Sequence, residues 1–502
     1  MTFQEFVRDV WPLLDRPWPA VDARYRETHG GAEPRSADRA FAYWRLFNLS
    51  RQIEAPARDP AQFAAHDFRA QVADLWPPAP PPVPASVPRA AQGHTRLDGR
   101  CFADARGPYA ALGATYFYAA HSDPDRLDQN LRWLAAQGCD YIRILLMVGA
   151  PPYWPFQIPP RSWEAYQRVL HGAARHGLRV QPVIFADAHE MMPDTAERAA
   201  FVGEVAAWCL QRRDQIQFIE VANESGQNGI TLDELTRYCT ILQTHCDIPF
   251  AASSPTGSLD PEEGLERLYR DHGCRSPLAT AHFDRTAWEE GYRIIRQPWH
   301  YQFTGHHSYM PRAFVNNEPA GYGAKQGGVS IPEQFGMAAL YTVLSGGAAY
   351  CWHTLAGVKG YQDDNQTAVN FEDTPRGAEM WTSMRSLIDA IPGNLANGEV
   401  ANHHWTAPRH PLQPSLDDQI WTDGRHHGVV RAFARRHGAI WYVGLLGIDR
   451  YVDVIPNRDV RADLRHPVTG SSVWQGDLTA GQTQRIEAAG DTRSYLLTLE
   501  EV

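Results

Sequence analysis

Lysine is the amino acid that this 502-residue sequence most clearly lacks, because only Lys325 and Lys359 are present. Both fall in loops that follow predicted strands, and neither ends a strand. A barrel enzyme that forms a Schiff base with its substrate needs a lysine at a strand end. The sequence therefore argues against an aldolase of that kind.

Long apolar runs and basic stretches are also missing. The net charge is −11, and no basic cluster is present that would neutralise phosphates, which argues against a nucleic-acid partner. No window approaches the roughly 18 apolar residues of a membrane span, so we expect no membrane partner. The N-terminus lacks the basic and apolar regions of a signal peptide. We therefore expect a cytoplasmic protein, and export by another route stays open.

Motifs for metals and cofactors are absent as well. The seven cysteines are scattered, and none forms a Cys-x-x-Cys pair, so neither a zinc knuckle nor a disulfide framework is indicated. A metal-dependent barrel hydrolase would carry His-x-His at the end of its first strand, where this chain has Tyr116-Phe117-Tyr118. We therefore expect no metal and no cofactor.

The chain divides into four predicted segments. Residues 1–76 show apolar residues at helical spacing and are predicted to be helical. A proline-rich run follows, and residues 77–104 are assigned to a linker and lead-in. Residues 105–395 alternate between strand-like and helix-like stretches. Residues 396–502 hold short β-rich runs between turn signals, which predict a small all-β, sandwich-like domain.

The alternation predicts a (β/α)8 TIM barrel, because it repeats eight times without the Gly-rich phosphate loop of an open doubly wound sheet. The predicted strands are 110–118, 140–147, 178–186, 216–223, 248–254, 277–283, 312–318 and 348–354. The predicted helices are 125–137, 162–176, 194–213, 231–245, 260–272, 284–297, 331–345 and 375–391. The predicted strands of the last segment are 428–434, 439–446, 473–474 and 494–499.

Two of the barrel strands end in Asn-Glu. The fourth delivers Asn223-Glu224, and the seventh delivers Asn317-Glu318. The two glutamates are 94 positions apart, close to three strand–helix units of roughly 31 residues each. Parallel barrels place their functional groups at the carboxyl ends of strands, so both carboxylates are predicted to face one cleft.

This pattern resembles clan A of the glycoside hydrolases, a (β/α)8 group that includes the family-5 cellulases and mannanases. The resemblance covers roughly residues 105–395. It implies Glu224 as acid/base, Glu318 as nucleophile and Asn223 as a ligand of the sugar 2-hydroxyl. It further implies four substrate-binding residues at strand ends, namely Arg143, His189, His282 and Trp352.

The sequence departs from the family-5 pattern after the sixth strand. That pattern has His-x-Tyr, whereas this chain has His282-Phe283-Asp284. Tyr309, which lies before the seventh strand, is a candidate to replace the missing tyrosine. The departure indicates a distant family of the clan.

Two carboxyl groups in one cleft are the equipment of glycoside hydrolysis, and a retaining enzyme holds them ~5–5.5 Å apart. We therefore expect a retaining hydrolase acting on a β-linked oligo- or polysaccharide. An inverting mechanism, with the groups ~6.5–9.5 Å apart, stays open. So do a transglycosylase, which would use the same residues, and a carbohydrate-binding protein without turnover. The sugar, the linkage and the oligomeric state are not indicated by the sequence.

Overall fold

The computed structural model describes residues 91–149, 154–254, 261–282, 311–319, 332–360, 369–400, 431–446, 451–487, 492 and 494–502. They belong to one compact unit, which comprises Ser86–Lys325 and Ser330–Val502. The predicted helical segment 1–76, the proline-rich run, helix 284–297 and Tyr309 lie outside the described residues. The boundaries of the four segments stay predictions.

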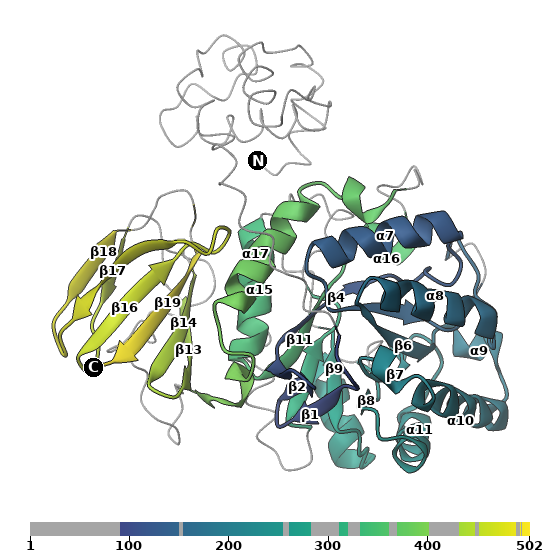
Figure 1. Cartoon of the computed structure of the whole chain (residues 1–502). Coiled ribbons are helices and arrows are strands. Elements are labelled where there is room, and N and C mark those ends of the chain that lie inside the picture. The colour runs from purple at the N-terminus through teal and green to yellow at the C-terminus, as the bar shows by residue number, and fades with distance from the viewer. Residues whose placement is uncertain are drawn as a thin grey trace, which may run out of the picture. The chain divides into compact units, whose positions relative to one another are not determined.

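Eight parallel strands close into a barrel in the order β10-β11-β4-β5-β6-β7-β8-β9, which confirms the predicted fold (Figure 1). Each observed strand lies within the range predicted for it or starts one residue earlier. The strands are β4 (Ala111–Thr115), β5 (Tyr141–Leu145), β6 (Arg179–Phe185), β7 (Ile219–Ala222), β8 (Phe250–Ala251), β9 (Leu278–Ala281), β10 (Ala313–Asn316) and β11 (Gly347–Trp352).

The helices that connect the strands surround the barrel, and the predicted ones within the described residues are confirmed. Two short helices, α9 and α16, are additional. The helices are α7 (Pro124–Ala136), α8 (Trp163–Arg175), α9 (Ala188–Met191), α10 (Thr195–Leu210), α11 (Leu232–His245), α12 (Pro261–Glu266, continuing as a π-helical turn over Arg267–Asp271), α15 (Pro332–Leu344), α16 (Leu355–Lys359) and α17 (Gly377–Asp389).

Local sequence explains where several helices begin. Asp123 precedes α7 and accepts a hydrogen bond from the Arg126 amide, and Asp194 does the same for two amides of α10. Thr231 and Glu234 form a capping box at the start of α11. Such caps satisfy backbone amides that have no partner within the helix.

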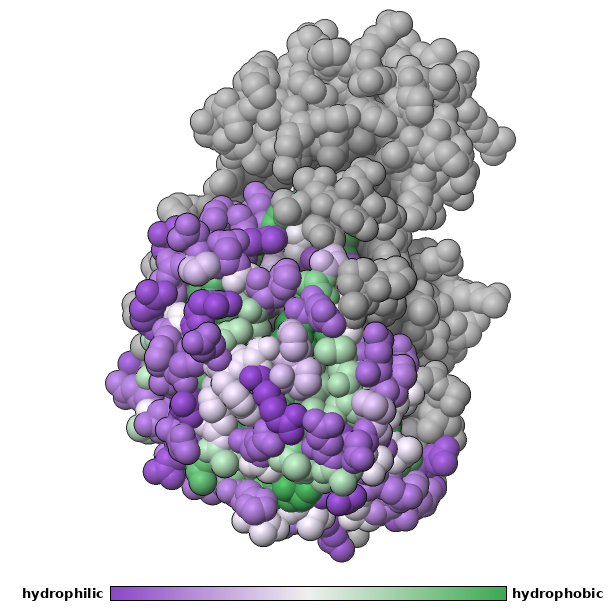
Figure 2. Space-filling model, turned by 90° about the vertical axis from the view of Figure 1, so that its right-hand side faces the viewer, coloured by the Kyte–Doolittle hydropathy of each residue, from purple (hydrophilic) through white to green (hydrophobic). Residues whose placement is uncertain are grey.

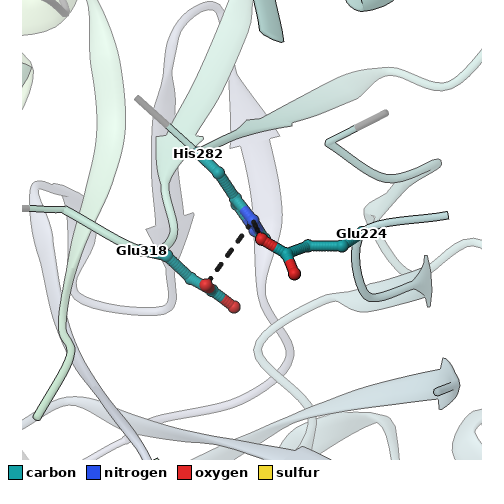
Figure 3. A group of neighbouring side chains, drawn as sticks. All are labelled: Glu224, His282 and Glu318. Carbon is teal, nitrogen blue, oxygen red and sulfur yellow. Dashed lines mark hydrogen bonds and ion pairs between the residues drawn. The ribbon is translucent and has the colours of Figure 1, made fainter. Parts of the chain in front are cut away.

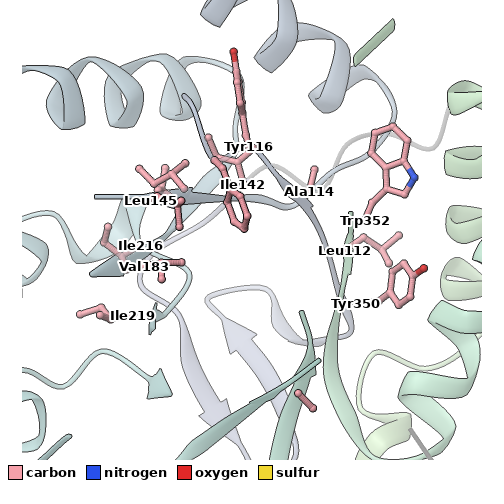
Figure 4. Close-up of a cluster of buried hydrophobic side chains, with 14 of the residues drawn as sticks. Leu112, Ala114, Tyr116, Ile142, Leu145, Val183, Ile216, Ile219, Tyr350 and Trp352 are labelled. Atoms are coloured by element: carbon pink, nitrogen blue, oxygen red, sulfur yellow. The ribbon is translucent and has the colours of Figure 1, made fainter. Parts of the chain in front are cut away.

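The side chains of the barrel strands alternate between two apolar clusters, one outside the barrel and one inside it. Outward-facing residues such as Leu112, Ile142 and Ile219 pack against the helices (Figure 4). Inward-facing residues such as Ala111, Tyr141 and Leu278 form a second cluster inside the barrel. Since successive side chains on a strand point to opposite faces, the two clusters follow from the period of two.

An antiparallel sheet of three short strands closes the N-terminal end of the barrel. It consists of β1 (Arg96–Asp98), β2 (Cys101–Asp104) and β3 (Gly107–Tyr109). Phe102 from this sheet stacks on Phe218 inside the barrel, with ring centroids 5.6 Å apart. β1 and β2 fall in the lead-in 77–104, for which no strand is predicted from the sequence.

The C-terminal region is all-β, as predicted. A six-stranded sheet has the order β12-β13-β14-β19-β16-β17, and a two-stranded sheet pairs β15 with β18. The two sheets share one apolar cluster, which includes Val452, Ile486 and Leu497. The strands are β12 (Glu399–Val400), β13 (Arg431–His437), β14 (Ile440–Leu446), β15 (Tyr451–Val454), β16 (Val460–Arg465), β17 (Ser472–Leu478), β18 (Gln484–Glu487) and β19 (Ser494–Glu501). The sequence gives no prediction for β12, β15, β16 and β18.

Helix α15 joins the barrel to this sheet. The Tyr341 hydroxyl donates a hydrogen bond of 2.8 Å to the carbonyl of Gly444 on β14. Arg435, which is 1% exposed, donates to the carbonyls of Leu344, Ala396 and Gly398 at 2.7, 2.6 and 2.9 Å. Burial, with a smaller contribution from nearby Arg100, lowers the pKa of the Arg435 guanidinium to about 9.

The side of the unit that carries α8 to α11 has a mostly hydrophilic surface with smaller apolar areas (Figure 2). None of the helices in the described part of the chain combines the length and the apolar character that a membrane crossing requires.

Replacing Arg435 with methionine should destabilise the protein by about 3 kcal/mol, because three buried carbonyls lose charged donors at once. Urea unfolding followed by fluorescence measures the change. Arg485→Met is the matched control, since Arg485 is largely exposed and pairs with Asp453 at the surface. An Arg435 variant as stable as the Arg485 variant would contradict the role assigned to this residue.

Candidate active site

Four titratable side chains meet at the carboxyl ends of the barrel strands. Glu224 follows β7, His282 follows β9, Glu318 follows β10 and His353 follows β11. In a parallel barrel the carboxyl ends of all strands lie on the same face, so residues up to 129 positions apart in the sequence come together there.

The two glutamates face each other across a short gap. One oxygen of Glu224, one oxygen of Glu318 and a ring nitrogen of His282 all lie within 4.8 Å of one another (Figure 3). His282 Nδ1 is 3.2 Å from Glu224 Oε1 and 3.6 Å from Glu318 Oε2. The side chain of Glu224 is 17% exposed and that of Glu318 only 4%. The predicted meeting of the two carboxylates is therefore present in the structure.

Arg143 on β5 connects both Asn-Glu endings. Its Nη1 donates to Glu318 Oε1 at 2.6 Å, its Nη2 to Asn223 Oδ1 at 2.7 Å and its Nε to Glu220 Oε2 at 2.9 Å. Burial lowers the pKa of Arg143, but Glu220 and Glu318 outweigh that effect and raise it above its ordinary value. The guanidinium is thus a permanent positive charge beside Glu318.

Glu220 lies one layer deeper in the barrel, at 0% exposure. Besides Arg143, its carboxylate accepts hydrogen bonds from Gln181 Nε2 at 2.9 Å and from Asn317 Nδ2 at 2.9 and 2.8 Å. No role is predicted for it from the sequence. The signal was available, because Glu220 is the only charged residue in the apolar run 218–222.

His353 approaches the same oxygen of Glu318 as His282 does. Its Nε2 is 3.7 Å from Glu318 Oε2, and its Nδ1 is 2.8 Å from the hydroxyl of Thr115 on β4. Cys351, two residues earlier, contacts the same hydroxyl at 3.7 Å. Burial raises the pKa of the Cys351 thiol to about 12, although Arg143 acts in the opposite direction. The thiol is therefore neutral near pH 7 and is not the nucleophile of this site.

The backbone at Glu224 has an unusual conformation. Its φ is 39°, a left-handed value that residues other than glycine seldom adopt. Asn228, which is 7% exposed, holds this turn, since its Nδ2 donates to the carbonyls of Asn223 and Glu224 at 2.6 and 3.2 Å. Its Oδ1 accepts from the amide of Asp187, at the end of β6. Asn228 therefore links two loops and fixes the direction in which Glu224 points.

One sequence prediction needs correction. Trp352 is fully buried between the barrel and the helices, against Trp133, Phe371 and Trp381, so it does not line the cleft (Figure 4). The next residue, His353, takes the place beside Glu318. His189 is exposed on α9 and packs against Gly229, in the loop that follows Glu224, and its role in substrate binding stays a prediction. Tyr309 lies outside the described residues.

Glu224, His282 and Glu318 also offer the ligand types that a divalent metal uses. The Arg143 guanidinium, 2.6 Å from Glu318 Oε1, places a positive charge on the same carboxylate and disfavours a cation there. The arrangement suits a reaction at a neutral substrate that uses one fixed carboxylate and one more accessible carboxyl group.

Fold and site together define a (β/α)8 barrel with two carboxyl groups at its C-terminal face. No protein-family profile matches the chain, and no curated protein matches it by sequence. Among solved structures, a glycoside hydrolase of family 5 from Bacteroides vulgatus ATCC 8482 is similar, with a TM-score of 0.59 at 14% identity over 82% of this chain and 94% of that one. Another, named only as a glycoside hydrolase, gives 0.58 at 12% identity over 82% and 97%. These likenesses show a shared fold.

Replacing Asn228 with alanine should loosen the turn that carries Glu224. The variant loses three hydrogen bonds, two of them to carbonyls of the turn. Losing those two weakens the turn by about 1–3 kcal/mol, so backbone amides in peptide 223–230 should exchange with solvent about 10- to 100-fold faster. Hydrogen–deuterium exchange with mass spectrometry measures this. Gln227→Ala is the control, because the Gln227 side chain is exposed. Equal exchange in both variants would show that Asn228 does not hold the turn.

Proposed function

We propose that this protein is a retaining glycoside hydrolase that cleaves a β-linked glycan or glycoside by double displacement. The observation that carries the proposal is the approach of Glu224 and Glu318, whose nearest oxygens lie within 4.8 Å. That spacing fits the ~5–5.5 Å of retaining enzymes and is too short for the ~6.5–9.5 Å of inverting ones, which need room for a water molecule. The fold shared with named glycoside hydrolases supports it.

Glu318 takes the role of nucleophile. It is nearly buried, and its Oε1 is held by the charged Arg143, which keeps the side chain ionised and fixed. Its Oε2, the oxygen that faces His282 and His353, then attacks the anomeric carbon. A carboxylate held in one orientation reacts without first losing rotational freedom.

Glu224 takes the role of acid and then of base. Its greater exposure suits a group that must meet both the leaving group and the incoming water. In the first step it gives its proton to the glycosidic oxygen as that bond breaks and the ester to Glu318 forms. In the second step it takes a proton from water, which attacks the anomeric carbon and releases Glu318.

Asn223 is proposed to bind the sugar beside these groups. A guanidinium has only donors, so Arg143 fixes Oδ1 of the Asn223 amide toward itself. The amide nitrogen then points elsewhere and can donate to a hydroxyl of the bound sugar. His282 and His353, whose ring nitrogens lie 3.6 and 3.7 Å from Glu318 Oε2, are further candidates for contact with the same sugar.

A transglycosylase would use every one of these residues, with a sugar hydroxyl in place of water. A non-hydrolytic carbohydrate-binding protein is the alternative from another class. Binding without hydrolysis does not require two carboxyl groups at this spacing, nor an arginine that forms an ion pair with one of them. Product analysis with and without a sugar acceptor distinguishes a transglycosylase from a hydrolase. Any turnover of a glycoside distinguishes an enzyme from a carbohydrate-binding protein.

Replacing Glu318 with glutamine should lower kcat on an aryl β-glycoside at least about 1,000-fold, because the amide cannot form the glycosyl ester. A panel of 2-deoxy-2-fluoro glycosides, followed by peptide mass spectrometry, should label Glu318 in the wild type and identify the preferred sugar. Glu379→Gln, at an exposed position on α17, is the control. A Glu318 variant that keeps a tenth of wild-type activity would rule out this nucleophile.

Replacing Glu224 with alanine should affect substrates unequally. Glycosides with poor leaving groups need the proton and should lose about 1,000-fold or more in kcat, whereas activated aryl glycosides should form the ester readily and then stall. Added azide, which needs no general base, should restore turnover and give a β-glycosyl azide. Formation of the α-azide instead would indicate inversion and contradict the double displacement.

A further inference from the structure

We propose that Glu220 is a positioning residue that orients Arg143 and divides its positive charge between two carboxylates, so that Glu318 remains reactive. The inference rests on the proposed function of Glu318 as nucleophile. It assigns a role to a residue that has no exposed surface and therefore touches no substrate.

Glu220 is the centre of the polar layer inside the barrel. Its two oxygens accept from three side chains on three different strands or strand ends, namely Arg143 on β5, Gln181 on β6 and Asn317 after β10. A buried carboxylate is costly unless it is paired and hydrogen-bonded. Here each partner is a donor at 2.8–2.9 Å, so the ionised form is well satisfied.

Two of these contacts lead directly to Glu318. Arg143 binds Glu220 through Nε and Glu318 through Nη1, and because the guanidinium is planar, fixing Nε also fixes the direction of Nη1. Asn317 immediately precedes Glu318 in the chain, and its Nδ2 is held by both oxygens of Glu220. Glu220 therefore restrains Glu318 in two ways. It fixes the guanidinium that binds Glu318, and it anchors the side chain of the residue that precedes Glu318.

The charges give Glu220 a second effect. One guanidinium stands between two carboxylates, and the other ionisable groups around them in the described part of the chain include His282, His353, Glu224, the buried Cys351 thiol and the buried Tyr141 hydroxyl. Without Glu220, the full charge of Arg143 would act on Glu318 alone. The Glu318 carboxylate would then be stabilised, which makes it a weaker nucleophile and a better leaving group.

Glu220→Gln tests this. Removing a nearby negative charge makes it easier for Glu318 to lose its proton, so the acidic limb of kcat/KM should move to lower pH by about one unit. Glycosylation should slow about 10- to 100-fold, whereas deglycosylation should not slow, and the burst of released aglycone should shrink. An acidic limb that stays in place would overturn the proposal, as would an equal slowing of both steps.

Gln181→Met separates charge from packing, because it removes a hydrogen bond to Glu220 and leaves every charge in place. We expect a lower melting temperature in this variant and an unchanged acidic limb. If both variants shift the limb equally, Glu220 has only a structural role and the proposal fails.

A measurement that does not depend on enzymatic activity tests the role of Glu220 separately from the proposed function. In protein with ¹³C-labelled glutamate side chains, the Glu318 carboxyl signal, assigned by its loss in Glu318→Gln, can be titrated by NMR. Its midpoint should be lower in Glu220→Gln than in wild type. A lower midpoint in a protein without glycosidase activity would refute the function and keep the electrostatic role, whereas an unchanged midpoint in an active enzyme would refute only that role.

Discussion

The candidate site depends on the Arg143 guanidinium, which is fully buried and donates to Glu220, Asn223 and Glu318. A buried charge is stable only when opposite charges and hydrogen bonds replace its hydration, and burying such a pair is often no better for stability than apolar packing. The three contacts therefore do little for the stability of the barrel. What they provide is geometry, because one rigid planar group fixes two loops that are distant in sequence. Both Asn-Glu endings are aligned by the same cation.

The barrel interior changes character along its axis. At the N-terminal end, apolar residues and the β1–β3 sheet fill it, with Phe102 on Phe218 and Tyr141 nearby. Two residues further along β5, the same inward face carries Arg143, and β7 likewise carries Glu220 two residues after Phe218. Side chains two residues apart on a strand face the same side, so β5 and β7 each change from apolar packing to polar contacts within one repeat. Buried polar contacts lie at the N-terminal end as well, where Arg179 at the start of β6 pairs with Asp104 and donates to the Tyr109 hydroxyl.

Much of this arrangement could be predicted from the sequence. The eight strands were visible as apolar runs, and the two glutamates as acidic endings of such runs. The error at Trp352 came from orientation, which apolar character does not encode. Trp352 ends β11, but Cys351 before it faces inward, so Trp352 faces the helices and His353 turns to the cleft. After β6 the backbone adopts a left-handed φ of 53° at Asp187, and His189 follows on the short helix α9, beside Gly229 of the loop that carries Glu224. Glu220 was detectable as a charge inside an apolar strand. Its partners on β6 and after β10 could not be identified without knowing the register of the strands in the barrel.

The two carboxyl groups are held in different ways, and the difference matches the roles proposed for them. Glu318 has a charged partner, a neighbouring asparagine anchored on Glu220 and almost no exposure. Glu224 is positioned by its backbone, through a left-handed turn that Asn228 holds from outside the strand. A nucleophile must meet one carbon from one direction, so a rigid anchor favours it. A group that delivers and then recovers a proton must serve two partners in succession. A position on a restrained turn, with some access to solvent, allows that without disturbing the anchor of its partner.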